Sequence, residues 1–143
     1  MIRACRKTDL DRLTAIWLEA SIQAHHFIPT SYWEANKEDV CNHYIPMSET
    51  YVWVDEDTEE IYGFISLLAD NLAAIFIDPS QQRRQIGKAL VQMAKEKRNF
   101  LKLTVYTENK EAIMFYERLD FVIRQEQLDE ATGHSEYVMV WQK

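Results

Sequence analysis

The sequence predicts a mixed domain of the α/β or α+β type, in which helices cover both faces of one sheet. Two observations predict it. In the middle of the chain, apolar residues alternate along short segments and then recur at helical spacing in the segments between them. Around this middle part, pairs of apolar segments are separated by short polar turns, as in antiparallel hairpins. The 143 residues, 47% of them hydrophobic, are expected to form a single domain, 1–143.

Each predicted element depends on a local pattern. Thr8 is placed to cap the first helix, with Asp11 as its partner in a capping box. Pro29 separates the first two helices, Pro79 ends a strand, and Asn109 is suited to begin the last helix. The expected strands are 2–5, 51–55, 61–68, 72–78, 101–106, 121–128 and 137–141. The expected helices are 8–24, 31–44, 86–98 and 109–119, with a loop at 46–49.

Charge is unevenly distributed along the chain. The net charge is −7, yet residues 83–102 contain seven basic side chains and one acidic side chain, Glu96. This basic segment is either a solvated helix face or an anion site, and the acidic remainder would attract cations. A chain this acidic is not expected to bind nucleic acid or an anionic membrane.

Other features limit the classes of protein further. No apolar run approaches the roughly 20 residues of a membrane span, and the charged N-terminus differs from a signal peptide, so we expect a cytoplasmic protein. Cys5 and Cys41 have the pattern of reduced packing residues. The four histidines lack metal-ligand spacing, so no metal is expected.

The basic segment begins with the outline of a phosphate site. A strand ends at Pro79, a polar loop follows, and a helix opens at Ile86 with free backbone N–H groups that favour an anion. A P-loop is excluded because Ala89 follows Lys88 where Ser or Thr is needed. By itself, this segment predicts a phosphorylated cofactor.

Asn109 and Tyr116 form a second pattern. Seven residues apart, they lie on one face of a helix, two turns from each other. Taken alone, they are better explained as a helix cap and a core aromatic residue than as functional residues.

Together, the two patterns resemble the GNAT superfamily of N-acetyltransferases, and in particular its small bacterial YiaC-type enzymes. The resemblance extends over the whole chain. It depends on the order and spacing of IFIDP, QRRQIGKAL, LKLTVY and NKEAIMFYERLDF, and on AHHFIPTSYW nearer the N-terminus. It implies a central mixed, mostly antiparallel sheet with helices on both faces, whose fourth and fifth strands splay apart to admit acetyl-CoA.

The resemblance also implies roles for individual residues. The strand backbone at residues 75–77 would bind the pantetheine and polarise the thioester carbonyl, and the loop at 82–88 would bind the pyrophosphate. Tyr116 would act as the general acid that protonates the departing thiolate, and the acceptor amine would attack the thioester directly. The implied cofactor-binding residues are Ile75, Phe76, Ile77, Gln82, Arg83, Arg84, Gln85, Ile86, Gly87, Lys88 and Asn109.

Three positions depart from the family pattern. Gln85 and Asp120 replace glycines, and Thr104 replaces the glutamate that serves related enzymes as a base. Glu108, or His25 through a water, is a candidate for this role, and proton loss to bulk water is a third alternative. His25 is otherwise expected in the acceptor site, which Tyr32 and Trp33 would border.

The function implied is that of an acetyl-CoA-dependent N-acetyltransferase acting on a primary amine. The expected acceptor is a protein lysine, a protein N-terminus or a small-molecule amine. The sequence leaves open whether the protein forms a homodimer. The alternative is a non-catalytic CoA-binding or interaction module with a GNAT fold, an interpretation motivated by Gln85 and Thr104.

Overall fold

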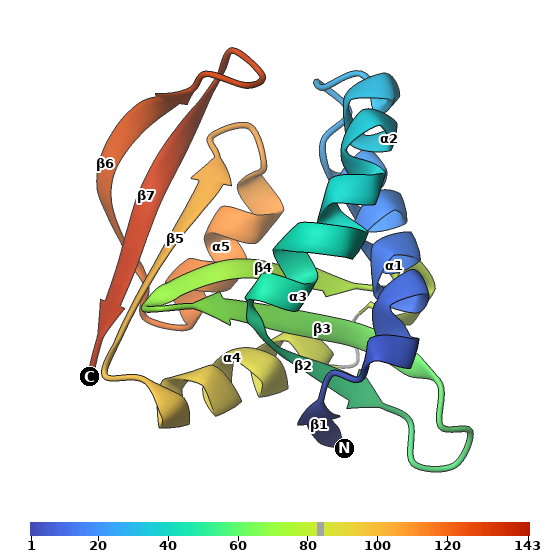
Figure 1. Cartoon of the computed structure of the whole chain (residues 1–143). Coiled ribbons are helices and arrows are strands. Elements are labelled where there is room, and N and C mark those ends of the chain that lie inside the picture. Colours follow the sequence, from blue (N-terminus) through green and yellow to red (C-terminus); the bar gives the residue numbers. More distant parts are fainter. Residues whose placement is uncertain (83–84) are drawn as a thin grey trace.

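The computed structural model describes residues 1–82 and 85–143. In this part of the chain one seven-stranded sheet has the order β1-β2-β3-β4-β5-β7-β6 (Figure 1). The neighbouring strands are antiparallel except for the parallel pair β4–β5. The strands are β1 Ile2–Ala4, β2 Glu49–Val54, β3 Ile61–Leu68, β4 Asn71–Ile77, β5 Phe100–Tyr106, β6 Val122–Asp129 and β7 His134–Gln142.

Helices cover both faces of the sheet, as predicted. On one face α4 and α5 pack over a core that includes Ile65 and Phe121; on the other, α1, α2 and α3 pack over a core that includes Phe64. Seven consecutive residues of β3 are buried because this strand lies between the two cores. The helices are α1 Leu10–Ala24, α2 Thr30–Asp39, α3 Ile45–Met47, α4 Ile86–Lys97 and α5 Lys110–Arg118.

β4 and β5 part immediately after they meet. In the described residues they share one paired position, Asn71 with Lys102, and in Figure 1 β5, β7 and β6 lean away from β4 beyond it. The register with β3 steps from Leu72 to Ala74, which makes Ala73 a bulge. A bulge bends its strand and increases the local twist, so β4 turns away from β5 at this point. The predicted splay is confirmed.

The predicted cap of the first helix was wrong. A turn of 3-10 helix, Lys7–Asp9, precedes α1, and Asp9 rather than Thr8 organises it. The Asp9 carboxylate accepts the backbone N–H of Arg6 at 2.8 Å and two N–H groups of Arg3 at 2.8 and 3.2 Å. A bidentate charged pair of this kind is stronger than a hydroxyl cap.

The second helix is longer than predicted. After α2 the chain continues through a π-helical segment, Val40–Tyr44, into α3, so the expected loop at 46–49 is helical up to Met47. Pro46 has no N–H and its ring crowds the preceding turn. The wider π turn before it accommodates that crowding without ending the helix.

Both residues that replace family glycines have left-handed backbone conformations. Gln85 precedes α4 with φ 59°, and Asp120 follows α5 with φ 70°. A side chain with Cβ is strained in this region, least so for Asp and Asn. Gln85 therefore carries backbone strain.

Gln85→Val is expected to lower the free energy of unfolding by about 1–2 kcal/mol, because β-branching adds to the strain of a left-handed backbone. Gln82→Val is the matched control, since Gln82 is exposed and extended at φ −67°, ψ 161°. Urea denaturation of the ligand-free protein measures both. Equal losses in the two variants would contradict the assignment of strain to Gln85.

Asp9 makes the stability of the fold depend on pH, with lower stability expected in acid. The hydrogen bond from Arg3 lowers the pKa of Asp9 below its ordinary value of 3.8. The stabilisation is therefore fully present above that value and is lost as the pH falls through the folded-state pKa. Asp9→Asn should lower the free energy of unfolding by about 1.5 kcal/mol at pH 7, and this difference should shrink at pH 3.

Urea midpoints at the two pH values test this expectation. Asp11→Asn is the control, because Asp11 is an exposed carboxylate in the first turn of the same helix. A difference between wild type and Asp9→Asn that is as large at pH 3 as at pH 7 would refute the role given to the carboxylate.

Candidate active site

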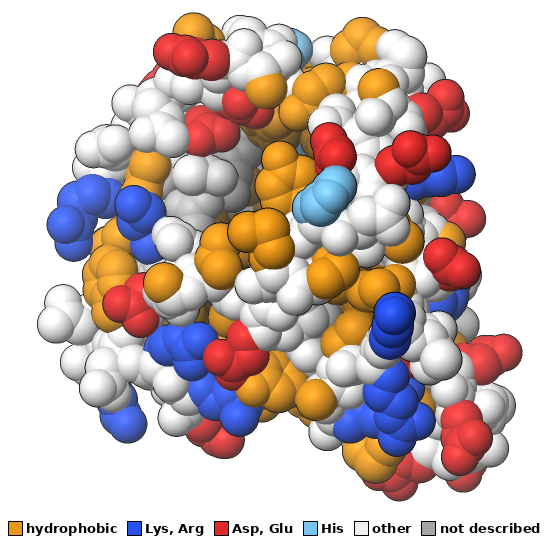
Figure 2. Space-filling model, in the orientation of Figure 1, with side chains coloured by type: hydrophobic (Ala, Val, Ile, Leu, Met, Phe, Trp, Pro, Cys, Tyr) orange, Lys and Arg blue, Asp and Glu red, His pale blue; other side chains and the backbone are white. Residues whose placement is uncertain are grey.

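A cleft of about 1090 Å³ lies where β4 and β5 separate. One side is formed by the start of α4 and by α5, and the other by the ends of α1 and α2 with the β6–β7 hairpin. In Figure 2 the surface is hollowed between the hairpin side and the α2 side, and hydrophobic side chains line the hollow. The opening in the sheet therefore continues as an opening in the molecular surface.

The structure brings the predicted cofactor residues together along this cleft. Those that line it are Ile75, Phe76, Ile77, Gln82, Gln85, Ile86, Gly87, Lys88 and Asn109. Arg83 and Arg84 lie outside the described residues.

The backbone of β4 supplies free hydrogen-bonding groups to the cleft. The N–H of Asp78 donates to the carbonyl of Tyr62 on β3 at 2.8 Å, so Asp78 faces β3. Because antiparallel residues alternate in direction, Phe76 also faces β3, while the N–H and C=O of Ile75 and Ile77 point toward the cleft. These groups are placed to bind an extended ligand as a further strand would be bound.

The start of α4 offers an anion site beside them. Its first N–H groups have no partner within the helix, and the helix dipole adds partial positive charge. A Cβ on Gly87 would lie 3.1 Å from Phe115 Cζ, so the missing side chain lets Phe115 pack close to the helix start. Oε1 of Gln81, which lines the cleft just before this loop, is buried without a hydrogen-bond partner in the described structure.

Tyr116 is a buried tyrosine whose ring lies at the cleft. It packs edge-on against Phe115 and Phe121, with ring centroids 5.3 and 5.7 Å away. Burial raises its pKa well above the ordinary value for a phenol. The raised pKa keeps the proton on the oxygen. In the described part of the chain the hydroxyl has no hydrogen-bond partner, so it is available to a ligand.

Asn109 links α5 to the opposite wall. Its Oδ1 accepts the N–H of Ala112 at 3.2 Å, which caps α5 and directs Nδ2 toward Nε2 of His25 at 3.3 Å. Because Nδ2 can only donate, Nε2 of His25 accepts and carries no proton. Burial lowers the pKa of His25, although the carbonyl of Ser21 opposes this shift, so the ring is a neutral imidazole with its proton on Nδ1.

The two candidate bases have different surroundings. His25 lies in the cleft wall, but its Nε2 lone pair is already engaged by Asn109. Glu108 follows the end of β5, is exposed, and lies 3.5 Å from Nδ1 of His134. It is not among the described residues that line the cleft, because β5 ends at Tyr106 and the strand alternation on which its prediction depended does not reach it.

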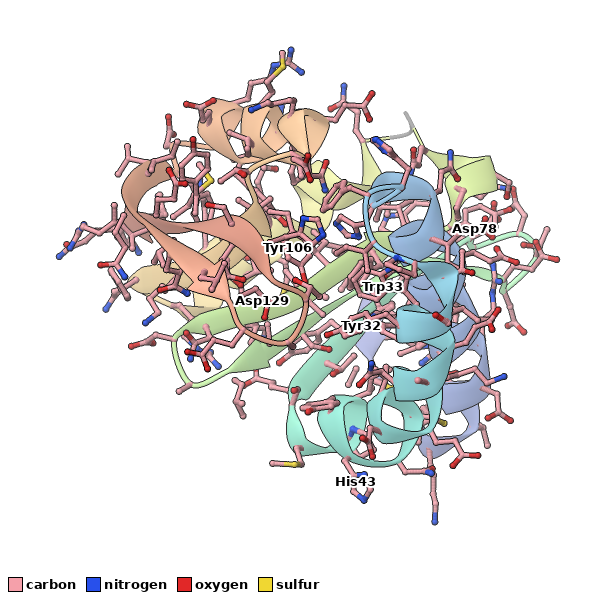
Figure 3. All side chains as sticks on the ribbon, turned by 90° about the horizontal axis from the view of Figure 1, so that it is seen from above. Tyr32, Trp33, His43, Asp78, Tyr106 and Asp129 are labelled. Carbon is pink, nitrogen blue, oxygen red and sulfur yellow. The ribbon has the colours of Figure 1, made fainter. Side chains whose placement is uncertain are left out.

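Aromatic rings form the wall opposite the cofactor residues. His25 stacks on Trp33 at 5.2 Å between centroids and meets Tyr106 edge-on at 5.2 Å. Trp33 lines the cleft, and Tyr32, which is not among its lining residues, packs edge-on against Trp33 at 5.0 Å; that the two border the acceptor site stays a prediction. Seen from above in Figure 3, Tyr106 lies across from these two residues of α2.

Sequence reasoning missed Asp129 and gave Tyr106 no role. The Tyr106 hydroxyl donates to Asp129 Oδ2 at 2.5 Å, and both residues line the cleft. Burial, and then this hydrogen bond, raise the pKa of Tyr106. The available signal was weak: Tyr106 shares a strand face with Thr104, and Asp129 is one of several acidic residues near the last hairpin.

The types of hydrogen-bonding group that line the cleft match the chemical groups of acetyl-CoA. Unpaired strand backbone suits an extended amide arm, a helix N-terminus suits a pyrophosphate, and the unpartnered oxygen of Gln81, a residue that lines the same cleft, can accept a hydrogen bond. The described residues contain no group of three or more His, Cys, Asp or Glu arranged to hold a metal ion. Nor do they contain a helix long and apolar enough to cross a membrane.

Comparisons with known proteins agree with this geometry. Residues 48–123 match the acetyltransferase (GNAT) domain. The chain is 33% identical to the peptidyl-lysine N-acetyltransferase YiaC of Escherichia coli over 142 residues, which cover 99% of this chain and 96% of the relative.

Solved structures share the fold. The apo form of YjaB from Escherichia coli matches with a TM-score of 0.86 at 24% identity, covering 99% of this chain and 96% of that one. The PaiA N-acetyltransferase of Thermoplasma acidophilum, solved with coenzyme A, matches with a TM-score of 0.80 at 20% identity, covering 100% of this chain and 98% of that one. The chain belongs to the GNAT acetyltransferase family and is an acetyl-CoA-dependent N-acetyltransferase that transfers the acetyl group to an amine.

Proposed function

We propose that the acceptor is the side-chain amine of a lysine in a protein or peptide. The supporting observation is the wall of aromatic rings formed by His25, Trp33 and Tyr106 beside the site of transfer. Aromatic faces contact an unbranched methylene chain well and attract a cation at its end. A relative that is 33% identical over nearly the whole chain bears the name peptidyl-lysine N-acetyltransferase, which is in line with this choice.

In the proposed reaction the β4 backbone holds and polarises the thioester. The N–H groups of Ile75 and Ile77 point into the cleft and can donate to the pantetheine arm and the thioester carbonyl. Donors fixed in this way stabilise the negative charge that develops on the carbonyl oxygen. Residues 82–88 and Asn109 bind the pyrophosphate and the pantetheine, which orients the acetyl group toward the aromatic wall.

Tyr116 supplies the proton that the leaving group needs. The lone pair of the neutral amine forms a bond to the carbonyl carbon, the carbon–sulfur bond breaks, and sulfur keeps that electron pair. The Tyr116 hydroxyl protonates the sulfur, the nitrogen releases one proton to water, and water restores the phenol. Burial raises the pKa of the phenol, and the same dry surroundings raise the basicity of the departing thiolate.

His25 acts as a positioning residue in this scheme. Its neutral ring keeps Asn109 oriented for the cofactor and presents its face to the acceptor, while the lone pair of Nε2 is used by the Asn109 amide. The amine therefore loses its proton to solvent rather than to His25.

Two compounds that each carry one amine test whether the lysine side chain is the acceptor. One is Nα-acetyl-lysinamide, whose amine is the side-chain group, and the other is a short lysine-free peptide with a free N-terminus. Mass spectrometry of the products should give at least tenfold higher kcat/KM for the lysine compound. Preference for the α-amine, or no transfer to either, would overturn the proposal.

Tyr116→Phe should reduce kcat by roughly 10²–10⁴-fold, the usual contribution of a general acid. The acetyl-CoA Kd should change less than threefold, because the ring and its packing are retained. Tyr44→Phe is the control, since Tyr44 is an exposed tyrosine in the π-helical segment. Kinetics measures kcat and calorimetry measures the acetyl-CoA Kd of both variants. An equal loss of affinity and turnover in Tyr116→Phe would argue against the acid role.

A further inference from the structure

The acceptor end of the cleft is bounded by residues that the cofactor does not need. The cofactor residues lie toward α4 and α5, whereas Trp33, Tyr106 and Asp129 lie at the opposite end, between α2 and the β6–β7 hairpin. Figure 3 shows Tyr106 and Asp129 facing Tyr32 and Trp33 across this opening. An amine that attacks the thioester has to pass between these residues.

Asp129 is held rigidly in this opening. Its Oδ2 accepts the Tyr106 hydroxyl at 2.5 Å and the Thr132 hydroxyl at 3.2 Å, and its Oδ1 accepts the backbone N–H of Ala131 at 3.1 Å. A carboxylate has about four lone-pair positions, so these three bonds leave acceptor capacity on Oδ1. The side chain is preorganised and still able to bind one more donor.

The negative charge of Asp129 reaches across the opening. The pKa of Tyr32, on α2, is raised by burial and then by the charge of Asp129. The charge of Asp129 therefore acts on both sides of the opening, at Tyr32 on one side and at Tyr106 on the other.

The opposite wall contains a buried N–H donor for which the described part of the chain supplies no hydrogen-bond acceptor. Nε1 of Trp33 is buried without a hydrogen-bond partner in the described part of the chain. Buried donors of this kind are rare in folded proteins. Because an ammonium group only donates, this donor would be completed by ordered water or by a carbonyl oxygen of a bound peptide. The aromatic rings of Trp33, His25 and Tyr106 on this side of the cleft match the methylene stem of a long primary amine.

We propose that Asp129 binds the ammonium group of the acceptor and that Tyr106 positions the Asp129 carboxylate for this contact. The inference rests on the proposed function, because it identifies the residue that recognises the lysine side chain. The acceptor arrives as an ammonium ion held by Asp129 Oδ1, with its stem along Trp33 and Tyr106. After it loses a proton to water, the free amine moves the remaining distance to the thioester.

Glu136 is the nearest alternative carboxylate on this wall. It is paired in register with Tyr106, but its Oε2 accepts the side-chain amide of Gln127 at 2.6 Å, which holds it toward β6. The proposal therefore assigns the recognition to Asp129 and predicts a smaller effect at Glu136.

NMR titration of the CoA-saturated protein with Nα-acetyl-lysinamide tests this assignment without requiring catalysis. In the wild type, the amide signals of Ala131 and Thr132 should shift with saturable binding. The uncharged Nα-acetyl-norleucinamide should produce no such binding. Asp129→Asn, which keeps an oxygen to accept the Ala131 N–H, should weaken the Kd at least tenfold, and Tyr106→Phe should weaken it by a smaller factor.

Glu130→Gln is the matched control, because it removes the same charge from an exposed neighbour in the same hairpin. It should leave the Kd within twofold of the wild type, and Glu136→Gln should weaken binding less than Asp129→Asn does. Unchanged affinity in Asp129→Asn, or binding without shifts at the hairpin, would overturn the assignment. A loss of turnover with unchanged affinity would also overturn it, since that pattern belongs to a proton acceptor. Failure of the proposed function is seen separately, as the absence of acetyl transfer to the same compound.

Discussion

The parting of β4 and β5 is the constraint on which the active site depends. The two strands pair at Asn71 and Lys102, and the bulge at Ala73 then turns β4 away. A parallel sheet normally satisfies its backbone groups strand by strand. Within residues 1–82 and 85–143, the outward backbone groups of Ile75 and Ile77 pair with no neighbouring strand. The fold keeps its stability because buried side chains on both faces hold the two halves of the sheet in place. The same opening provides the volume of the cleft and the hydrogen bonds for the cofactor.

A continuous set of contacts joins the cofactor side of this opening to the acceptor side. Asn109 caps α5 and donates to His25, the ring of His25 meets Tyr106, and Tyr106 donates to Asp129. Each contact fixes the orientation of the next residue, so the acceptor end is ordered relative to the pantetheine arm. The neutral state of His25 is part of this arrangement, because a protonated ring could not accept from Asn109.

The sequence correctly predicted those features of the fold that depend on interactions between residues close together in the chain. The change from strand to helix around Ile86, the cap at Asn109 and the face shared with Tyr116 are set by neighbours in sequence, and the structure confirms these elements. Thr8 failed as a cap because Arg3, five residues earlier, gives Asp9 a stronger interaction. The contact between Asp129 and Tyr106 was missed because the two residues are 23 positions apart and meet only in the folded structure. Glu108 is not among the described residues that line the cleft, because β5 ends two residues before it, and its role as a base stays a prediction.

Amide hydrogen exchange in β4, with and without CoA, tests the central claim most directly. Without CoA, the amides of Ile75 and Ile77 should exchange quickly and that of Phe76 slowly. Among these three residues, only Phe76 directs its amide toward β3. Saturating CoA should slow Ile75 and Ile77 at least tenfold and leave Phe76 nearly unchanged. If CoA binds and leaves the exchange of Ile75 and Ile77 unaffected, the opening between β4 and β5 is not the cofactor site.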